Sequence, residues 1–275
     1  MSVPLLSVIT INYNDAQGLK KTMDSVLRQT YANFEYIVID GNSTDTSVAQ
    51  IKTYADNRLR WISEPDSGIY NAMNKGILLA KGAYVLFVNS GDYLISSIIL
   101  EEVISLYDFK ASFIGGNLCL EKEGGLEEKK HPEKISFNYL LTKTIYHPAT
   151  FIKKELFDRY GLYNEHNKII SDWEFFFKTI GLNGESFHKI DKAVTVFDMN
   201  GISSNPENEK LIQFEKNRVL QKYLKAMFNS DLDAFLLSQI KAPSKRIKLL
   251  KKIEKSPLIR KVTTVILTVL SKLVK

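Results

Sequence analysis

The chain of 275 residues contains a single cysteine, Cys119, which excludes a disulfide within the chain. The fold therefore does not depend on an oxidising compartment. No apolar run reaches about 18 residues, so no segment is expected to span a membrane. The first residues, MSVPLLSVIT, lack the basic region and the small-residue cleavage site of a signal peptide. Together these absences predict a cytoplasmic protein.

Glycine-rich phosphate-binding patterns are also missing after the first apolar run. Neither G-x-G-x-x-G nor G-x-x-x-x-G-K occurs there, which argues against a dinucleotide-linked dehydrogenase and against a P-loop enzyme. There is no Cys/His cluster with zinc spacing and no G-x-S-x-G nucleophile elbow. A nucleotide bound by this chain would be held by side chains and a metal ion instead.

Acidic residues are almost absent from residues 241–275, which contain eleven Lys or Arg and one acid, Glu254. This segment carries a net charge of +10, whereas residues 1–240 carry 26 basic and 30 acidic side chains. The sequence therefore predicts two parts, a mildly acidic domain (residues 1–240) and a basic tail (residues 241–275) whose partner is an anionic surface. No nucleic-acid role is expected, because the tail lacks interleaved aromatic residues.

The basic tail also carries apolar residues at helical spacing, which predicts amphipathic helices that Pro257 divides. They are Leu258, Ile259, Val262, Val265, Ile266, Val269, Leu270 and Leu273. One interpretation is that these helices lie on an anionic membrane, at the inner face of the cell membrane. The other is that the apolar stripe packs on the preceding domain. The charge of +10 favours the membrane.

Short apolar runs alternate with helical patterns over the first 94 residues. Strands are predicted at residues 5–11, 34–39, 59–62 and 84–88. Helical spacing is seen for Leu19, Met23, Val26 and Leu27, for Val48, Ile51 and Ala55 after Ser43 as a helix cap, and for Ile69, Ala72, Met73, Gly76, Ile77 and Ala80. This order predicts an α/β fold, a Rossmann-like, mostly parallel sheet with helices on both faces.

Polar residues follow each predicted strand, namely Asn12, Asp40, Glu64 and Asn89. Because parallel strands end at the same edge of a sheet, these residues are expected to line one rim, where ligands bind in such folds. The segment Asn89-Ser90-Gly91-Asp92 offers oxygen atoms on a tight turn, which suit a hard divalent cation and the phosphates it carries. The alternative is a polar turn that only ends the strand.

The regular alternation of predicted strands and helices ends at Asp92. Helices are predicted at residues 95–107 and 208–228, strands at 111–120 and 187–199, a hairpin or loop at 121–130 and an extended segment at 145–152. Asp172 opens a further helix, either as an acid of its first turn or as a general base. His147 lies in an apolar segment, where a lone histidine is more often structural than catalytic.

Several motifs occur in order between residue 6 and about residue 199. They are SVITINYN, SVLRQTYANFEYIVIDGNSTD, SEPDSGIYNAMNKGILLAKGAYVLFVNSGD, YHPATFIKKELF and ISDWEFF. With them the chain resembles the inverting GT-A glycosyltransferases of family 2, of the kind that build polysaccharides. The resemblance implies a GT-A fold and transfer of a sugar, with inversion, from a nucleotide-diphosphate sugar to an acceptor hydroxyl. It also implies a UDP-sugar in preference to a GDP-sugar.

The resemblance assigns a role to each matching position. The nucleotide sugar would be bound by Thr10, Asn12, Asp40, Asp66, Asn74 and Asn89, Mn²⁺ or Mg²⁺ by Asp92, and the acceptor by His147 and Trp173. Asp172 would be the catalytic base. The sequence departs from the family at Asn89, where the family usually has Asp, and at Gly91, which is often acidic there, so Asp92 is the one charged ligand that this segment offers a metal ion.

Two functions from different classes are compatible with these residues. The first is a membrane-associated glycosyltransferase that builds a surface polysaccharide on a lipid-linked saccharide. The second is a non-catalytic protein that binds nucleotide sugars, or a scaffold, derived from such an enzyme; the missing acids of the metal segment motivate it. The presence of both Asp92 and Asp172 favours the enzyme.

Overall fold

A computed structural model describes residues 5–122 and 124–227, together with residues 256, 259, 262–264 and 266. The chain divides into two compact units, residues 1–215 and 216–275, and the sheet lies in the first. Apart from the few described positions, the predicted basic tail lies outside the described residues. No helix in the described part of the chain is long and apolar enough to cross a membrane.

The first half of the first unit alternates strands and helices as the sequence predicts. The elements are β1 (Leu6–Asn12), α1 (Ala16–Leu27), β2 (Phe34–Asp40), α2 (Ser47–Ile51), β3 (Leu59–Ser63), α3 (Ile69–Leu79) and β4 (Tyr84–Phe87). Strand β1 pairs in parallel with both β2 and β4, and β2 pairs in parallel with β3. The parallel arrangement brings the carboxyl ends of these strands to one edge.

The second half adds strands of mixed direction. Its elements are β5 (Tyr93–Leu94), α4 (Ile99–Leu106), β6 (Phe113–Lys122), β7 (Gly125–Lys129), α5 (Phe137–Thr142), the 3₁₀ turn η1 (His147–Ala149), β8 (Thr150–Lys153), α6 (Glu155–Tyr160), α7 (Ser171–Phe176), the π-helical turn η2 (Phe177–Leu182), β9 (Phe187–Phe197), the 3₁₀ turn η3 (Pro206–Asn208) and α8 (Glu209–Met227). Nine strands of the described residues form one sheet, in the order β3-β2-β1-β4-β8-β6-β9-β5 with β7 paired to β6. The pairs of β8 with β4 and β6, and of β9 with β5, are antiparallel.

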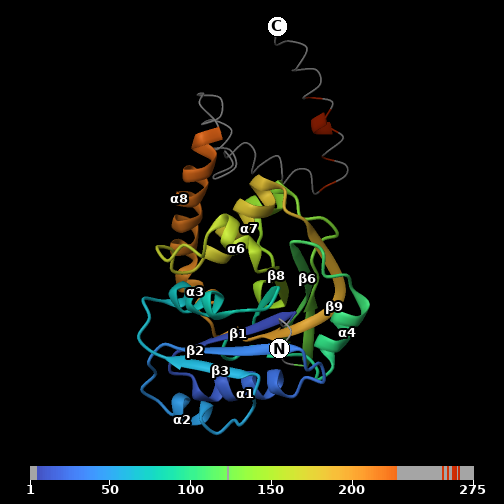
Figure 1. The fold of residues 1–275 in the computed structure, drawn as a ribbon. Coiled ribbons are helices and arrows are strands. Elements are labelled where there is room, and N and C mark those ends of the chain that lie inside the picture. Colours follow the sequence, from blue (N-terminus) through green and yellow to red (C-terminus); the bar gives the residue numbers. More distant parts are fainter. Residues whose placement is uncertain are drawn as a thin grey trace. The chain divides into compact units, whose positions relative to one another are not determined.

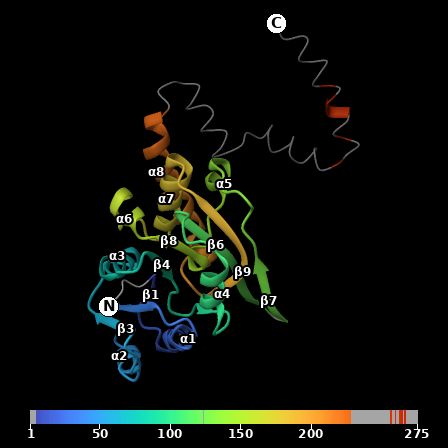
Figure 2. The same ribbon diagram turned by 45° about the vertical axis from the view of Figure 1, so that its right-hand side comes forward.

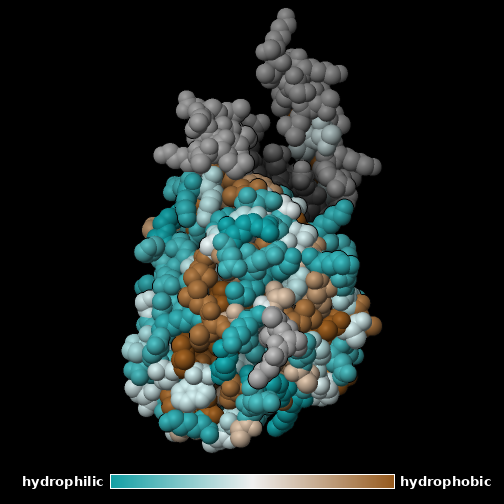
Figure 3. Space-filling model, in the orientation of Figure 1, coloured by the Kyte–Doolittle hydropathy of each residue, from teal (hydrophilic) through white to brown (hydrophobic). Residues whose placement is uncertain are grey.

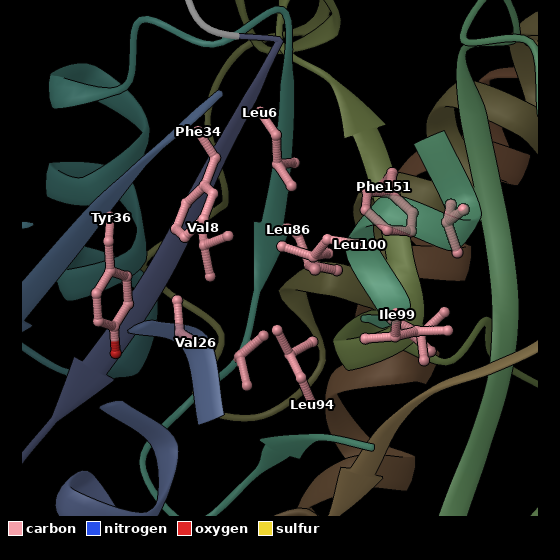
Figure 4. Packing of buried hydrophobic residues seen from close by; sticks show 14 of the residues in the cluster. Leu6, Val8, Val26, Phe34, Tyr36, Leu86, Leu94, Ile99, Leu100 and Phe151 are labelled. Atoms are coloured by element: carbon pink, nitrogen blue, oxygen red, sulfur yellow. The ribbon is translucent and has the colours of Figure 1, made fainter. Parts of the chain in front are cut away.

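Helices cover both faces of the parallel strands, with α1 and α2 on one face and α3 on the other (Figures 1 and 2). Side chains of β1 alternate between these faces, as in any strand. Leu6 and Val8 belong to the core cluster that contains Val26 of α1, Phe34 and Tyr36 of β2, and Leu86 of β4 (Figure 4). Burial on both faces explains why these strands are continuously apolar.

Helix α3 approaches the sheet closely because Gly76 has no side chain. A Cβ atom at Gly76 would lie 2.6 Å from Cγ2 of Ile9 and 3.5 Å from Cγ1 of Ile39. The predicted apolar stripe of this helix is confirmed, since Ala72, Met73 and Ile77 are buried. The tight contact fixes α3, whose first turn lies at the rim of the sheet.

Three local predictions are wrong in detail. Helix α2 ends at Ile51, so Ala55 lies outside it and is exposed, and the Ser43 hydroxyl bonds Asp40 rather than capping the helix. The helix predicted over 95–107 begins only at Ile99. The segment 145–152 is extended only in part, because Pro148 lies in the 3₁₀ turn that precedes β8.

The surface in view is mostly hydrophilic, with apolar side chains in scattered patches (Figure 3). Exposed apolar residues of the first unit include Leu78 and Leu79 of α3, Ile98 at the N-cap of α4, Leu106 at the end of α4, and Phe214 of α8. Such scattering is normal for a globular protein and identifies no interface by itself.

Candidate active site

The ends of β1, β2 and β3 meet at the buried carboxylate of Asp40. Asn12 lies beside Asp40 in the register of β1 and β2, and Ser63 lies beside it in the register of β2 and β3. Oδ1 of Asp40 accepts from Nδ2 of Asn12 at 2.8 Å and from the Ser43 hydroxyl at 2.6 Å. Oδ2 accepts from the Ser43 N–H at 3.0 Å and from the Ser63 hydroxyl at 2.7 Å. The predicted rim of polar strand ends is thus present.

These hydrogen bonds determine the charge state of Asp40. Burial acts to raise its pKa, but the bonds from Ser43, Ser63 and Asn12 together outweigh burial and hold the pKa of Asp40 below its ordinary value. The carboxylate is therefore ionised at neutral pH. Because both oxygens already have donors, a nucleoside that bonds Asp40 would share or replace one of them.

The loops that follow β1, β2 and β3 also meet at the rim, around Gly41. A Cβ atom at Gly41 would lie 2.5 Å from Oδ2 of Asp66 and 3.2 Å from the ring of Tyr13. Tyr13 is 67% exposed, immediately after the end of β1. An exposed aromatic ring beside a carboxylate offers a face for stacking a base and an acceptor for its N–H groups. Tyr13 is not among the binding residues predicted from the sequence, although it directly follows a predicted strand end.

Two of the predicted nucleotide contacts have side chains that are used inside the protein. Thr10 is buried, and its hydroxyl donates to the Val88 carbonyl at 2.5 Å. Asn74 of α3 exchanges two hydrogen bonds with the backbone of Tyr163, at 2.9 and 3.0 Å, and donates to Glu165 at 2.8 Å. Contact with a nucleotide would require these side chains to turn, so their binding roles stay predictions.

Asp92, in the segment after β4, lies next to a second carboxylate that the sequence analysis did not anticipate, that of Asp198. The backbone N–H of Asp198, which follows β9, donates to Oδ1 of Asp92 at 2.8 Å. A Cβ atom at Gly91 would lie 2.6 Å from Oδ2 of Asp198, so glycine at this position, with φ of +94°, leaves room for the second acid. Burial raises the pKa of Asp92 to about 8. The hydrogen bond from the Asp198 N–H acts to lower this pKa, and the charge of Asp198 acts to raise it.

The residues after β4 and β9 fit a hard divalent cation. Both carboxylates lie together, and Oδ1 of Asn89 is buried without a hydrogen-bond partner in the described residues. A buried oxygen without a hydrogen-bond partner and a pair of carboxylates are the chemistry that Mn²⁺ or Mg²⁺ prefers. No group of three or more His, Cys, Asp or Glu with metal-site geometry occurs in the part of the chain that the structure describes. The remaining ligands would therefore have to come from water or from a bound diphosphate.

Asp172 lies in the first turn of α7, where the helix N-terminus favours a negative charge. Its Oδ1 accepts from the hydroxyl of Tyr70, at 2.9 Å. No other hydrogen bond to this carboxylate is present among the described residues, so Oδ2 is available to another partner. A half-buried carboxylate with one oxygen bound and one available has the form of a general base.

Aromatic side chains connect Asp172 with the end of β4. Phe87, the last residue of β4, stacks on His147 with ring centroids 4.8 Å apart, and Nε2 of His147 lies 2.9 Å from the hydroxyl of Tyr163. Burial lowers the pKa of His147, and the charge of Asp172 acts in the opposite direction. Together with the bond from Tyr70 in the first turn of α3, these contacts place Asp172 on the side of the sheet where β3 and β4 end.

The two predicted acceptor contacts lie in the interior. His147 is bonded to Tyr163, and the indole N–H of Trp173 donates to the Leu140 carbonyl at 2.7 Å while its ring stacks on Phe177. A saccharide would reach either side chain only if its neighbours moved. Their acceptor role stays a prediction.

Comparison with known proteins identifies the class of this protein. The family described as glycosyl transferase family 2 matches residues 7–164, which is more than half of the chain. The chain belongs to this family, as its motifs indicate, and it is a glycosyltransferase. Its fold is that of the GT-A enzymes.

Particular relatives agree with this assignment. The uncharacterized glycosyltransferase Rv1514c of Mycobacterium tuberculosis is 31% identical over 217 residues, 75% of this chain and 79% of the relative. The UDP-Glc:alpha-D-GlcNAc-diphosphoundecaprenol beta-1,3-glucosyltransferase WfgD of Escherichia coli is 30% identical over 139 residues, 50% of this chain and 55% of that protein. Staphylococcus aureus TarS 1–349, solved in complex with UDP-GlcNAc, shares the fold with a TM-score of 0.63 and 21% identity, over 86% of this chain and 70% of TarS.

Proposed function

We propose that this glycosyltransferase moves a sugar from a nucleotide-diphosphate sugar to an acceptor hydroxyl with inversion of the anomeric carbon. The observation that carries the proposal is the Asp172 carboxylate, held through one oxygen by Tyr70 and available through the other. Its position on the side of the sheet where β3 and β4 end fits a base that acts on an acceptor beside a bound donor.

Different residues of the chain activate the acceptor, bind the nucleoside and would hold the metal ion. Asp172 takes the proton from the acceptor hydroxyl as that oxygen attacks the anomeric carbon, so the new bond forms opposite the departing diphosphate and the configuration inverts. Asp40, Asp66 and Tyr13 hold the nucleoside, the two acids by accepting hydrogen bonds and the ring by stacking. A divalent cation held by Asp92, Asp198 and Asn89 would offset the charge that grows on the diphosphate.

The relatives support a more specific donor and acceptor. The name of WfgD states a UDP-sugar donor and a diphosphoundecaprenol-linked acceptor, and the TarS structure was solved with UDP-GlcNAc. On this basis the donor proposed here is a UDP-sugar, and the acceptor is a lipid-linked saccharide in the synthesis of a surface polysaccharide.

An acceptor on a lipid would place the enzyme at a membrane surface. The net charge of +10 in residues 241–275 supports attraction to anionic lipids. Of the described tail positions, Ile259, Val262 and Ile266 are helical and 49%, 56% and 52% exposed. Their spacing puts them on one side of a helix, as expected for an apolar face that enters the lipid headgroup region. The proposed location is therefore peripheral, at the cytoplasmic face of the membrane.

The test of the proposed function compares donor binding with turnover. Thermal stabilisation by UDP-sugars and GDP-sugars, with and without Mn²⁺, identifies the donor, because bound donor raises stability by mass action. Turnover is then measured as release of UDP in the presence of an undecaprenyl-diphosphate-linked saccharide, and product NMR gives the anomeric configuration. Asp172→Asn is expected to bind donor normally and to lose about 10²- to 10⁴-fold in turnover.

The matched control is Asp158→Asn, which removes an exposed acid of α6 and should leave both properties unchanged. If Asp172→Asn keeps most of its turnover, Asp172 is not the base. If the parent protein binds a donor but never releases UDP with any acceptor, the non-catalytic alternative holds instead.

A further inference from the structure

The phenol of Tyr70 lies between two acceptors at the start of α7. Its oxygen is 2.5 Å from the carbonyl oxygen of Ile169 and 2.9 Å from Oδ1 of Asp172. A phenol has one hydrogen to donate, so the hydroxyl can turn between the carbonyl and the carboxylate. It would favour the carboxylate whenever Asp172 is charged, because a hydrogen bond to a charged acceptor is the stronger one.

Tyr70 is buried beside residues that are themselves held by hydrogen bonds. It is buried in the first turn of α3, and its ring lies against that of Tyr163, with centroids 5.7 Å apart. Asn74, one helical turn later, binds the backbone of Tyr163 on the same side of α3. The segment before Asp172 is fixed independently, because Glu215 accepts from the backbone N–H groups of Lys168 and Ile169 at 2.6 and 3.1 Å.

Tyr70 also belongs to the helix that begins at the predicted donor contact. Asp66 precedes it by four residues, and Oδ1 of Asp66 accepts from the N–H of Gly68 just before α3 starts. Residues 66–70 therefore carry both a carboxylate predicted to bind the nucleotide sugar and the phenol that binds Asp172, the proposed general base. A tyrosine with a purely structural hydroxyl, such as buried Tyr84, instead donates to a backbone carbonyl, that of Ala111 at 2.7 Å.

We propose that Tyr70 is a positioning residue of the transfer reaction: its hydroxyl holds Oδ1 of Asp172 and thereby directs Oδ2 toward the acceptor hydroxyl. This inference rests on the proposed role of Asp172 as the base. It assigns Tyr70 a role that acts through Asp172 rather than through contact with donor or acceptor.

The hydrogen bond has a measurable consequence for the pH dependence of the reaction. A donor to the charged form of a carboxylate favours that form, so loss of the phenol should move the acid limb of the kcat/KM profile to higher pH. The other groups that face Asp172 are Tyr163 and His147, and its own helix adds Glu174, which is bound by Asn164 and Asn167. Tyr70→Phe keeps the ring that lies against Tyr163 and replaces none of these groups.

The experiment compares Tyr70→Phe with Tyr84→Phe in the full-length protein. Both changes remove a buried hydroxyl, but only the first removes a bond to a carboxylate. For Tyr70→Phe the acid limb of the kcat/KM profile is expected to move up by about one pH unit, as expected for one charge-assisted hydrogen bond. Turnover at the optimum should fall about tenfold because the base is less well oriented, while donor affinity stays at the parent value. Tyr84→Phe should leave the acid limb in place.

A direct titration separates this inference from the proposed function. The carboxyl ¹³C signal of Asp172, assigned with Asp172→Asn, reports its protonation without any turnover. If the midpoint of that titration moves to higher pH in Tyr70→Phe although the parent transfers no sugar, the positioning contact stands and the proposed function fails. If the parent is active and neither the signal nor the acid limb moves in Tyr70→Phe, the inference is wrong.

A second variant covers the case in which Tyr70→Phe does not fold. Incorporation of 3-fluorotyrosine at position 70 keeps the shape and makes the phenol a stronger donor. The acid limb and the ¹³C titration are then expected to move to lower pH relative to the parent. No movement in either measurement would overturn the inference, since a structural hydroxyl bonded only to Ile169 would not affect Asp172.

Discussion

The backbone N–H of Asp198 donates to the carboxylate of Asp92 at 2.8 Å, across 106 residues of sequence. The contact brings a second carboxylate to a segment in which Asn89 and Gly91 stand at positions that are often acidic in the family. A second acid next to Asp92 supports the proposed enzyme rather than the non-catalytic alternative.

Loss of either carboxylate of this pair should weaken metal binding. We expect Asp92→Asn and Asp198→Asn each to reduce Mn²⁺ affinity in the presence of UDP by tenfold or more, because each removes a charged oxygen ligand. Isothermal titration with Mn²⁺ measures this directly, and circular dichroism checks the fold. Asp108→Asn, at an exposed acid paired with Lys110, is the control. Parent-like Mn²⁺ affinity in Asp198→Asn would remove that residue from the metal site.

Asp40 should contribute to stability as well as to donor binding. Asp40→Asn replaces an acceptor of four hydrogen bonds by a group that also donates, and we expect a loss of about 2 kcal/mol in unfolding free energy at pH 7. Since the folded pKa of Asp40 is depressed, its contribution is present above the unfolded value of 3.8 and is lost as pH falls through the folded pKa. Urea denaturation of parent and variant should therefore differ most near neutrality and converge in acid.

An equal difference between parent and Asp40→Asn at pH 7 and at pH 3 would show that the charge of Asp40 is not the source of its effect. Ser63→Ala provides a graded comparison, because it removes a single 2.7 Å hydrogen bond from the same carboxylate. It should cost about 1 kcal/mol.

Buried His131 should make the protein less stable in mild acid. Burial, with the charge of Lys189, lowers the pKa of His131 to about 4, below the unfolded value of 6.5. The unfolded chain therefore binds the proton first, and stability falls as pH drops from about 6.5 to about 4. In His131→Gln the unfolding free energy should fall less over this pH range than in the parent, by up to about 3 kcal/mol. Denaturation at several pH values tests this, with exposed His188→Gln as the control; equal slopes in parent and His131→Gln would contradict it.

The tail should bind membranes through charge. Full-length protein is expected to sediment with anionic vesicles at low salt, much less in high salt, and little with neutral vesicles. Charge reversal of three tail lysines should remove most of this binding, at about 1 kcal/mol per residue. The tail changes are Lys251→Glu, Lys252→Glu and Lys255→Glu, and the control carries Lys52→Glu, Lys81→Glu and Lys134→Glu in the domain. Equal binding by the two triple variants would exclude a specific role for the tail.

The first half of the fold was predictable because its signals are local. Each apolar run of strand length ends in a polar residue, and short loops force consecutive elements to be neighbours in a parallel sheet. The expectation that Asn12 and Asp40 lie together is confirmed by the register of β1 and β2. The same reasoning placed Asp92 on the tight turn after β4, and its N–H closes this turn on the Asn89 carbonyl at 3.0 Å.

The contacts of Asp198 and Tyr70 could not be predicted in this way. Asp198 reaches Asp92 only because β9 pairs with β5, more than 100 residues earlier, and no periodicity in the sequence encodes that pairing. Tyr70 matches the helical pattern of an ordinary core residue, and its partner is 102 residues away. The sequence analysis extended the last strand to residue 199 and so placed Asp198 inside it, whereas β9 ends at Phe197 and leaves Asp198 at the strand end.

The position of β9 in the sheet has a consequence for synthesis of the protein. Strand β9 lies between β6 and β5, both of which leave the ribosome more than 60 residues before it. Until β9 arrives, β5 and β6 each present an unpaired edge, which is a site for pairing with other chains. The same strand delivers Asp198, so a nascent or prematurely ended chain would have the parallel half of the fold but an incomplete carboxylate pair. Closure of the sheet and completion of the proposed metal site are therefore a single late event.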